Sequence, residues 1–164
     1  MKHEFTGQRI AVLVDTANMY HSAKSRFQRR VDYRQLLKLI VNERQLVRAV
    51  AFVERNEDSE ITPFVDALKG VGFETRVKTI RRHPDQRPHR GDWDIGITLH
   101  AVELAKHVDA IALVTGNGVF IDLIDYLYHH GVRSEIYAFE GCVSGELIQS
   151  ADRWYPIGED WLMP

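Results

Sequence analysis

Short apolar runs alternate along the chain with stretches of helical periodicity, and this alternation constrains the fold more than any other feature. Residues 10–14 and 110–114 are apolar at every position, which is typical of central strands in a parallel sheet that is buried on both faces. Further β-rich runs cover residues 46–53, 73–80 and 132–139. Residues 73–80 alternate more between polar and apolar side chains, which indicates an edge strand.

Helical patterns fill the gaps between these runs. Residues 33–42, 61–71, 94–107 and 120–130 carry apolar side chains at helical spacings, which predicts amphipathic helices that lie on a sheet. Strands that alternate with helices imply right-handed crossovers and a parallel sheet. We therefore expect a three-layer α/β/α sandwich of Rossmann-like type, with residues 1–164 forming a single domain. In the helix over 94–107, the apolar positions are Ile95, Leu99, Val102 and Ala105.

The amino-acid composition limits the cellular compartments and binding partners that we expect. The 164 residues are 45% hydrophobic and 27% charged, as in ordinary globular proteins. Cys142 is the only cysteine, so no internal disulfide can form, which fits a reducing cytoplasm. No signal-like start and no apolar run of about 18 residues occurs, so we expect a cytoplasmic protein without a membrane partner. The net charge of −2 does not itself indicate nucleic acid, and the sequence leaves a homo-oligomer open.

Polar residues follow the predicted strands at their carboxyl ends, where open parallel sheets form their sites. Asp15 comes directly after the apolar residues 10–14, and a carboxylate there is costly unless it is paired, hydrogen-bonded or bound to metal. We interpret Asp15 as an active-site acid, with a helix N-cap as the alternative, and Asn18 lies within reach of the same cleft. The acids after the second run are interpreted as a solvated loop: Glu54, Glu57, Asp58 and Glu60.

Four motifs occur in order along residues 9–157. Residues 14–18 read VDTAN and resemble the opening motif of NYN domains. Residues 91–105 read GDWDIGITLHAVELA and look like the pattern GDWDxGxxxDAxELA. Residues 113–120 read LVTGNGVF, similar to LV[ST]GDxDF, and residues 144–152 read SGELIQSAD, similar to SxxLxxxAD. On these motifs the chain resembles the LabA-like branch of the NYN family, within the PIN-like nuclease superfamily.

This resemblance implies a PIN-like sheet of five strands in the order 3-2-1-4-5, and a metal-dependent endoribonuclease. In such families clustered acids hold Mg²⁺ or Mn²⁺, and the cation activates water to attack an RNA phosphodiester. The metal ligands that the resemblance implies here are Asp15, Asp94 and His100. The implied catalytic residues are Asp15, Asn18, Asp94, Asn117 and Asp122.

Three of the five positions that carry aspartate in the LabA-like pattern differ in this chain: they are His100, Asn117 and Val119. Val119 cannot bind a metal, and the imidazole of His100 suits Mn²⁺ or Zn²⁺ better than Mg²⁺. A neutral Gly-Asn-Gly turn at a helix start attracts anions through its backbone N–H groups. A second hypothesis is therefore a non-catalytic module that binds RNA or a nucleotide, with Gly116 and Gly118 contacting phosphate.

Two clusters of basic residues are candidates for RNA contacts. The first follows the strand over residues 73–80, and we expect its arginines to bind phosphates, with a solvated loop as the alternative. Trp93 beside it either stacks on a base or packs in the core. The second cluster, near the end of the first helix, is either a secondary RNA track or a solvated helix end. The first cluster contains Arg81, Arg82, Arg87 and Arg90, and the second contains Lys24, Arg26, Arg29 and Arg30.

Overall fold

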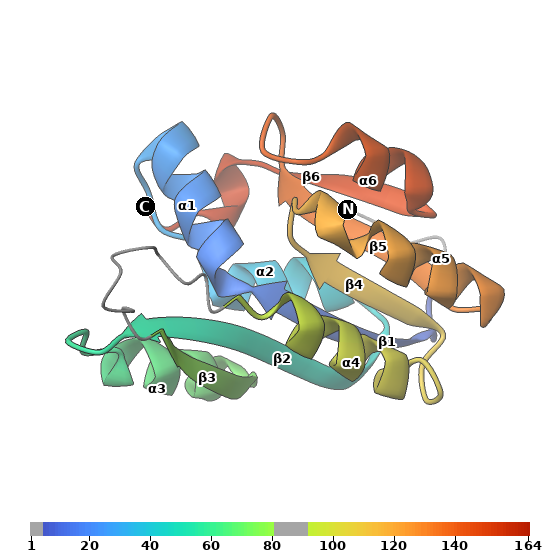
Figure 1. Ribbon diagram of the computed structural model, residues 1–164, viewed down its shortest axis with the longest axis horizontal. Helices are drawn as coiled ribbons and strands as arrows, with labels where there is room; N and C mark the ends of the chain where they lie inside the picture. The colour runs from blue at the N-terminus through green and yellow to red at the C-terminus, as the bar shows by residue number, and fades with distance from the viewer. Residues whose placement is uncertain (1–4, 81–91) are drawn as a thin grey trace, which may run out of the picture.

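The computed structural model describes residues 5–80 and 92–164, in which six parallel strands form one sheet in the order β3-β2-β1-β4-β5-β6 (Figure 1). The strands are β1 (Arg9–Asp15), β2 (Gln45–Asn56), β3 (Glu74–Ile80), β4 (Ala110–Val114), β5 (Arg133–Phe139) and β6 (Arg153–Ile157). The α-helices are α1 (Thr16–Phe27), α2 (Tyr33–Val41), α3 (Thr62–Val71), α4 (Asp94–Leu104), α5 (Ile121–His129) and α6 (Gly145–Ser150). Two short 3₁₀ helices, η1 (Gly118–Phe120) and η2 (Glu159–Trp161), complete the fold.

Two hydrophobic cores cover the two faces of the sheet. One contains Ile10, Val12 and Val14 of β1 with side chains of α1, α2 and α3. The other contains Ala11 and Leu13 of β1 with side chains of α4, α5 and α6. Each of these five β1 residues is at most 1% exposed, which confirms the prediction of a central strand buried on both faces.

The predicted α/β sandwich and the strand order 3-2-1-4-5 are confirmed, but a sixth strand extends the sheet. β6 pairs with β5, and the ring of Tyr155 in β6 stacks on Tyr137 of β5 with centroids 4.9 Å apart. The run over 153–157 contains Pro156, which has no N–H to donate to a ladder. An edge strand tolerates a proline because one side of it needs no partner. The five-strand count was therefore one strand short.

The buried face of α4 differs from the predicted one. Of the predicted stripe, Ile95 and Leu99 are 76% and 61% exposed, while Val102 and Ala105 are partly buried against the core. The fully buried residues are Ile97, Ala101 and Leu104. The buried residues also follow a spacing of four and three, so the helix carries apolar side chains on more than one face. Periodicity alone could not choose between the two stripes, and contact with the sheet selects the second.

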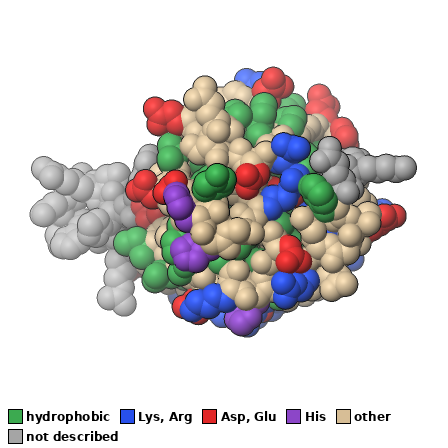
Figure 2. Space-filling view, turned by 90° about the vertical axis from the view of Figure 1, so that its right-hand side faces the viewer, with side chains coloured by type: hydrophobic (Ala, Val, Ile, Leu, Met, Phe, Trp, Pro, Cys, Tyr) green, Lys and Arg blue, Asp and Glu red, His purple; other side chains and the backbone are tan. Residues whose placement is uncertain are grey.

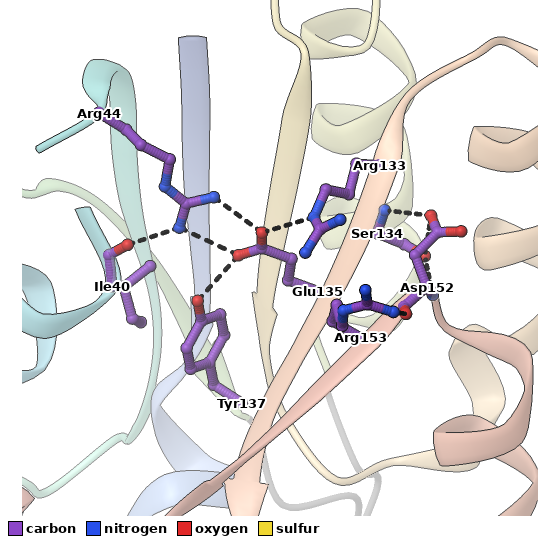
Figure 3. Close-up of polar contacts among 8 residues, drawn as sticks. All are labelled: Ile40, Arg44, Arg133, Ser134, Glu135, Tyr137, Asp152 and Arg153. Carbon is purple, nitrogen blue, oxygen red and sulfur yellow. Dashed lines mark hydrogen bonds and ion pairs between the residues drawn. The ribbon is translucent and has the colours of Figure 1, made fainter. Parts of the chain in front are cut away.

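A buried ion pair joins β5 to the turn before β2. Both carboxylate oxygens of Glu135 accept hydrogen bonds from Arg44, at 2.7 and 3.0 Å (Figure 3), and both side chains are 0% exposed. Arg133 and the hydroxyl of Tyr137 also donate to this carboxylate. Burial opposes ionisation of Glu135, but these donors outweigh it and lower its pKa. The Arg44 guanidinium also donates to the carbonyl of Ile40, so the pair fixes the end of α2 to the sheet.

The carboxyl ends of the central strands and the surface opposite them can be compared in Figures 1 and 2. β1 and β2 run toward the left of Figure 1, so the carboxyl ends of these strands lie where α1 begins. Figure 2 shows the opposite side, where acidic, basic and hydrophobic side chains are intermixed, as is typical of a solvated surface.

No helix in the part of the chain that the structure describes is long and apolar enough to cross a membrane.

Candidate functional site

Asp15 ends β1 and starts α1, and it contacts both neighbouring elements. Its Oδ1 accepts a hydrogen bond from the N–H of Asn18 at 3.1 Å, so Asp15 is the N-cap of α1. Its Oδ2 accepts a hydrogen bond from the hydroxyl of Thr115, just after β4, at 3.3 Å. Burial raises the pKa of Asp15 and the charge of Asp92 adds to this, against the lowering effect of the two hydrogen bonds. The N-cap alternative is confirmed, while the second oxygen points to the turn after β4.

Asn18 joins this turn to α1. Its Oδ1 accepts a hydrogen bond from the N–H of Gly116 at 3.0 Å. A Cβ at position 116 would collide with the backbone of Cys142 and Val143, so glycine is needed for close packing against that loop. The N–H of Gly116, which was predicted to contact phosphate, donates to Asn18 in this structure.

The remainder of the Gly-Asn-Gly turn is also held internally. The N–H of Asn117 donates to the hydroxyl of Thr115 at 3.3 Å, and the N–H of Val119 donates to Oδ1 of Asn117 at 3.1 Å. At Gly118 a Cβ would lie 2.8 Å from Oγ of Ser144, which again indicates a packing reason for glycine. Nδ2 of Asn117 lies 3.5 Å from Oδ1 of Asp94. The turn thus connects Asp15 to Asp94 through Thr115 and Asn117.

Glu54 belongs to the site, and the prediction that it lies in a solvated loop is wrong. β2 continues to Asn56, and Phe52 pairs with Asp15 in the sheet register, so Glu54 stands just beyond the end of β1. The pKa of Glu54 is raised to about 6, mainly by burial and then by the charges of Asp15, Asp92 and Asp94, while Lys78 lowers it. We call these four acids, Asp15, Glu54, Asp92 and Asp94, the carboxylate cluster.

Asp92 was also missed, although it is the first aspartate of the GDWD motif. Its Oδ1 accepts a hydrogen bond from the N–H of Asp94 at 3.4 Å, and its carbonyl accepts one from Nζ of Lys78 at 2.8 Å. The useful signal was the pair of aspartates two residues apart in that motif. The other acids after β2, namely Glu57, Asp58 and Glu60, are exposed as predicted.

Trp93 and His100 pack against the end of β2. Nε1 of Trp93 donates to the carbonyl of Val53 at 3.0 Å, its ring lies 5.3 Å from that of Phe52, and Nζ of Lys78 lies 4.3 Å from the Trp93 ring centroid. Packing is therefore the observed role of Trp93. Nδ1 of His100 is hydrogen-bonded to the carbonyl of Gly96 at 2.8 Å, and the ring meets Phe52 edge to face. These two contacts fix the position of the His100 ring against α4 and Phe52.

The remaining predicted site residues fall into two groups. Asp122 is exposed on the first turn of α5 and is not among the acids that raise the pKa of Glu54. The arginines predicted to bind RNA phosphates, Arg81, Arg82, Arg87 and Arg90, lie outside the described residues.

The chemistry of the carboxylate cluster fits a hard cation such as Mg²⁺ or Mn²⁺. Its ligands are all oxygens, and the raised pKa values of Asp15 and Glu54 show that ionised carboxylates here are desolvated and repel one another, a repulsion that a divalent cation would relieve. Within residues 5–80 and 92–164, no three acidic, histidine or cysteine side chains converge as a ready metal cage. Mg²⁺ commonly needs only one or two carboxylates, completed by water and substrate phosphate.

In proteins with an open α/β sheet, ligands bind beyond the carboxyl ends of the strands, and the carboxylate cluster lies at that position. Comparison with known families makes the assignment specific. Residues 9–158 match the NYN domain, and the chain belongs to this family.

Two known proteins are similar to the chain over most of its length. The chain is 25% identical over 162 residues to the low amplitude and bright protein LabA of Synechococcus elongatus, covering 94% of this chain and 87% of that protein. The crystal structure of a protein of unknown function from Vibrio parahaemolyticus matches with a TM-score of 0.88 and 32% identity, covering 99% of this chain and 100% of the other.

Proposed function

We propose that this protein is a metal-dependent endoribonuclease that cleaves RNA phosphodiesters at the carboxylate cluster. One observation carries the proposal: the pKa of Glu54, at the carboxyl end of β2, is raised to about 6 by burial and by the charges of Asp15, Asp92 and Asp94, which come from two other segments. Such an arrangement is costly for folding and is typical of sites that bind cations or transfer protons. Membership of the NYN family supports the same chemistry.

Asp15 and Asp94 are the residues that would hold the cation. They lie at the ends of the Asp15–Thr115 and Asn117–Asp94 hydrogen bonds, which orient both carboxylates toward the turn after β4. When bound, a divalent cation at such a site polarises the phosphate and neutralises charge that develops on it.

Glu54 is suited to proton transfer. A carboxyl group with a pKa of about 6 is mostly ionised at neutral pH and still basic enough to accept a proton. In hydrolysis, Glu54 would take a proton from the water whose oxygen bonds to phosphorus, while the bond from phosphorus to the leaving ribose oxygen breaks. Thr115 and the N–H of Asn18 hold Asp15 in place during this step.

A second candidate is a non-catalytic RNA- or nucleotide-binding module. It is favoured by Asn117, whose amide donates to Asp94 at a position where the family pattern has aspartate. A neutral donor there partly satisfies Asp94 without a cation, which weakens the site for metal.

Cleavage of end-labelled single-stranded RNA with Mg²⁺ or Mn²⁺, compared with a chelator, tests the proposal. Wild type is expected to cut only with metal, and Asp15→Asn and Asp94→Asn are expected to reduce cutting to background. Asp66→Asn, an exposed aspartate on α3, is the matched control and is expected to cut like wild type. Cutting that survives Asp15→Asn would overturn the assignment of the carboxylate cluster as the catalytic site. An inactive wild type that still binds RNA would favour the non-catalytic candidate.

A further inference from the structure

One exposed face of α1 begins at the carboxylate cluster and runs away from it. This face starts at the half-buried Asn18 and continues on one side of the helix through four exposed residues and the C-cap Gln28. The four exposed residues are Tyr20, His21, Lys24 and Ser25. The opposite side is buried, with Met19 and Ala23 among its residues. From Asn18 to Gln28 this face extends about 15 Å at 1.5 Å per residue.

A shallow hollow lies along this face. It has a volume of about 590 Å³ and is lined by His21, Lys24, Ser25 and Gln28. The ring of Tyr20 stands beside it and is 52% exposed. Nζ of Lys24 lies 3.3 Å from the Tyr20 hydroxyl and 5.4 Å from its ring centroid, and the ring of His21 meets Tyr20 edge to face at 5.3 Å. An exposed aromatic ring, an imidazole and an ammonium group are thus gathered in one place.

This combination complements the carboxylate cluster. Four acids attract a cation but repel the phosphates of a nucleic acid, so the strand needs positive and aromatic contacts outside the cluster. Exposed aromatic rings bind bases by stacking, and this requires bases that are not paired in a duplex. Along α1, Asn18 lies between Asp15 and the residues that line the hollow, and its Oδ1 accepts a hydrogen bond from the turn after β4.

We propose that the exposed face of α1 guides a single RNA strand to the carboxylate cluster, with Tyr20 stacking on a base and Lys24 contacting a phosphate. The identity of the strand as RNA rests on the proposed function. Within the second basic cluster, Lys24 is the member that lines the hollow. Arg29 instead donates to the carbonyl of Met163 at 2.7 Å and lies 3.7 Å from Glu159, so it is committed to the carboxyl-terminal segment. Of the residues predicted to form a secondary RNA track, the proposal therefore uses Lys24 and does not use Arg29.

Binding of a fluorescein-labelled single-stranded RNA, followed by anisotropy with a chelator present, tests this proposal without cleavage. Tyr20→Ala is expected to weaken binding at least about 5-fold, because one stacked base contributes roughly 1–3 kcal/mol, and Tyr20→Phe is expected to bind like wild type. Lys24→Ala is expected to weaken binding and to reduce the salt dependence by about 0.7 in the slope of log K against log salt, the contribution of one phosphate contact.

Two matched variants control for general loss of surface. Tyr128→Ala removes a tyrosine that is 70% exposed on α5, and Lys38→Ala removes an exposed lysine on α2. Both are expected to bind RNA like wild type. Because all four substituted side chains are exposed, circular dichroism is expected to show unchanged folding.

The outcomes separate this proposal from the proposed function. Wild-type binding by both Tyr20→Ala and Lys24→Ala overturns the α1 path, as does a wild type that binds duplex RNA as tightly as single strands or binds no RNA. Weaker RNA binding by Tyr20→Ala and Lys24→Ala, with unchanged binding by Tyr128→Ala and Lys38→Ala, supports the α1 path. If the losses occur and wild type still fails to cut RNA with any metal, the path stands and the proposed catalysis fails.

Discussion

Replacing Glu54 by glutamine removes a charge that burial and the neighbouring acids disfavour. The pKa of Glu54 is raised from 4.5 to about 6, a difference of about 2 kcal/mol between its two protonation states. Since the side chain is only half-buried, solvent screening reduces the expected effect on folding to about 1 kcal/mol. Because the pKa of Glu54 is higher in the folded state, protonated Glu54 favours folding. Its contribution to the free energy of unfolding is complete below pH 4.5 and is lost as the pH rises through 6.

Glu54→Gln is therefore expected to be more stable than wild type at about pH 8, by about 1 kcal/mol or roughly 2–4 °C in Tm. At about pH 4 the two proteins are expected to be equally stable. Urea unfolding followed by circular dichroism at both pH values measures this difference. Glu140→Gln, an exposed glutamate in the turn after β5, is the control and is expected to show no such pH-dependent gain.

The reasoning is refuted if Glu54→Gln gains no stability at pH 8, or gains equally at both pH values. Adding Mg²⁺ extends the experiment, because a cation that neutralises the carboxylate cluster stabilises the folded state by mass action. Wild type is expected to gain more in Tm from Mg²⁺ than Glu54→Gln does.

Two further substitutions test the packing around the site and the buried ion pair. Gly116→Ala is expected to destabilise the protein by about 1–3 kcal/mol, because its Cβ would collide with backbone at Cys142, whereas Gly145→Ala, with open space at its Cβ, is expected to be nearly neutral in thermal unfolding. Glu135→Gln leaves the buried guanidinium of Arg44 without its counter-charge and is expected to cost roughly 3–5 kcal/mol in urea unfolding; a loss below about 1 kcal/mol would contradict the assigned role of the pair.

The layered fold could be predicted because its strongest signals are local. A short apolar run such as residues 10–14 is typical of a strand buried on both faces, and alternation with helices favours a parallel sheet. β6 gave a weaker signal, since Pro156 interrupts a run that only an edge position tolerates. The buried face of α4 depends on which of two apolar stripes meets the sheet, and periodicity carries no information on that choice.

The site was predictable only where the chain itself brings residues together. Asp15 and Asn18 lie within one helical turn, and Asp94 stands in a motif shared with the family pattern. Glu54 depends on how far β2 extends past β1, which the sequence run ending at Val53 did not indicate. The hydrogen bond between Gly116 and Asn18 joins residues far apart in the chain, so the sequence did not indicate it.

Binding of Mn²⁺, measured by electron paramagnetic resonance, tests the central claim most directly, because it depends on the carboxylate cluster and not on the choice of RNA. Wild type is expected to bind Mn²⁺ at one site, with Mg²⁺ competing. Asp94→Asn is expected to weaken binding at least about 10-fold, and Asp66→Asn is expected to leave it unchanged. A wild type that binds no Mn²⁺, or binding that Asp94→Asn does not alter, would contradict the assignment of the carboxylate cluster as a cation site.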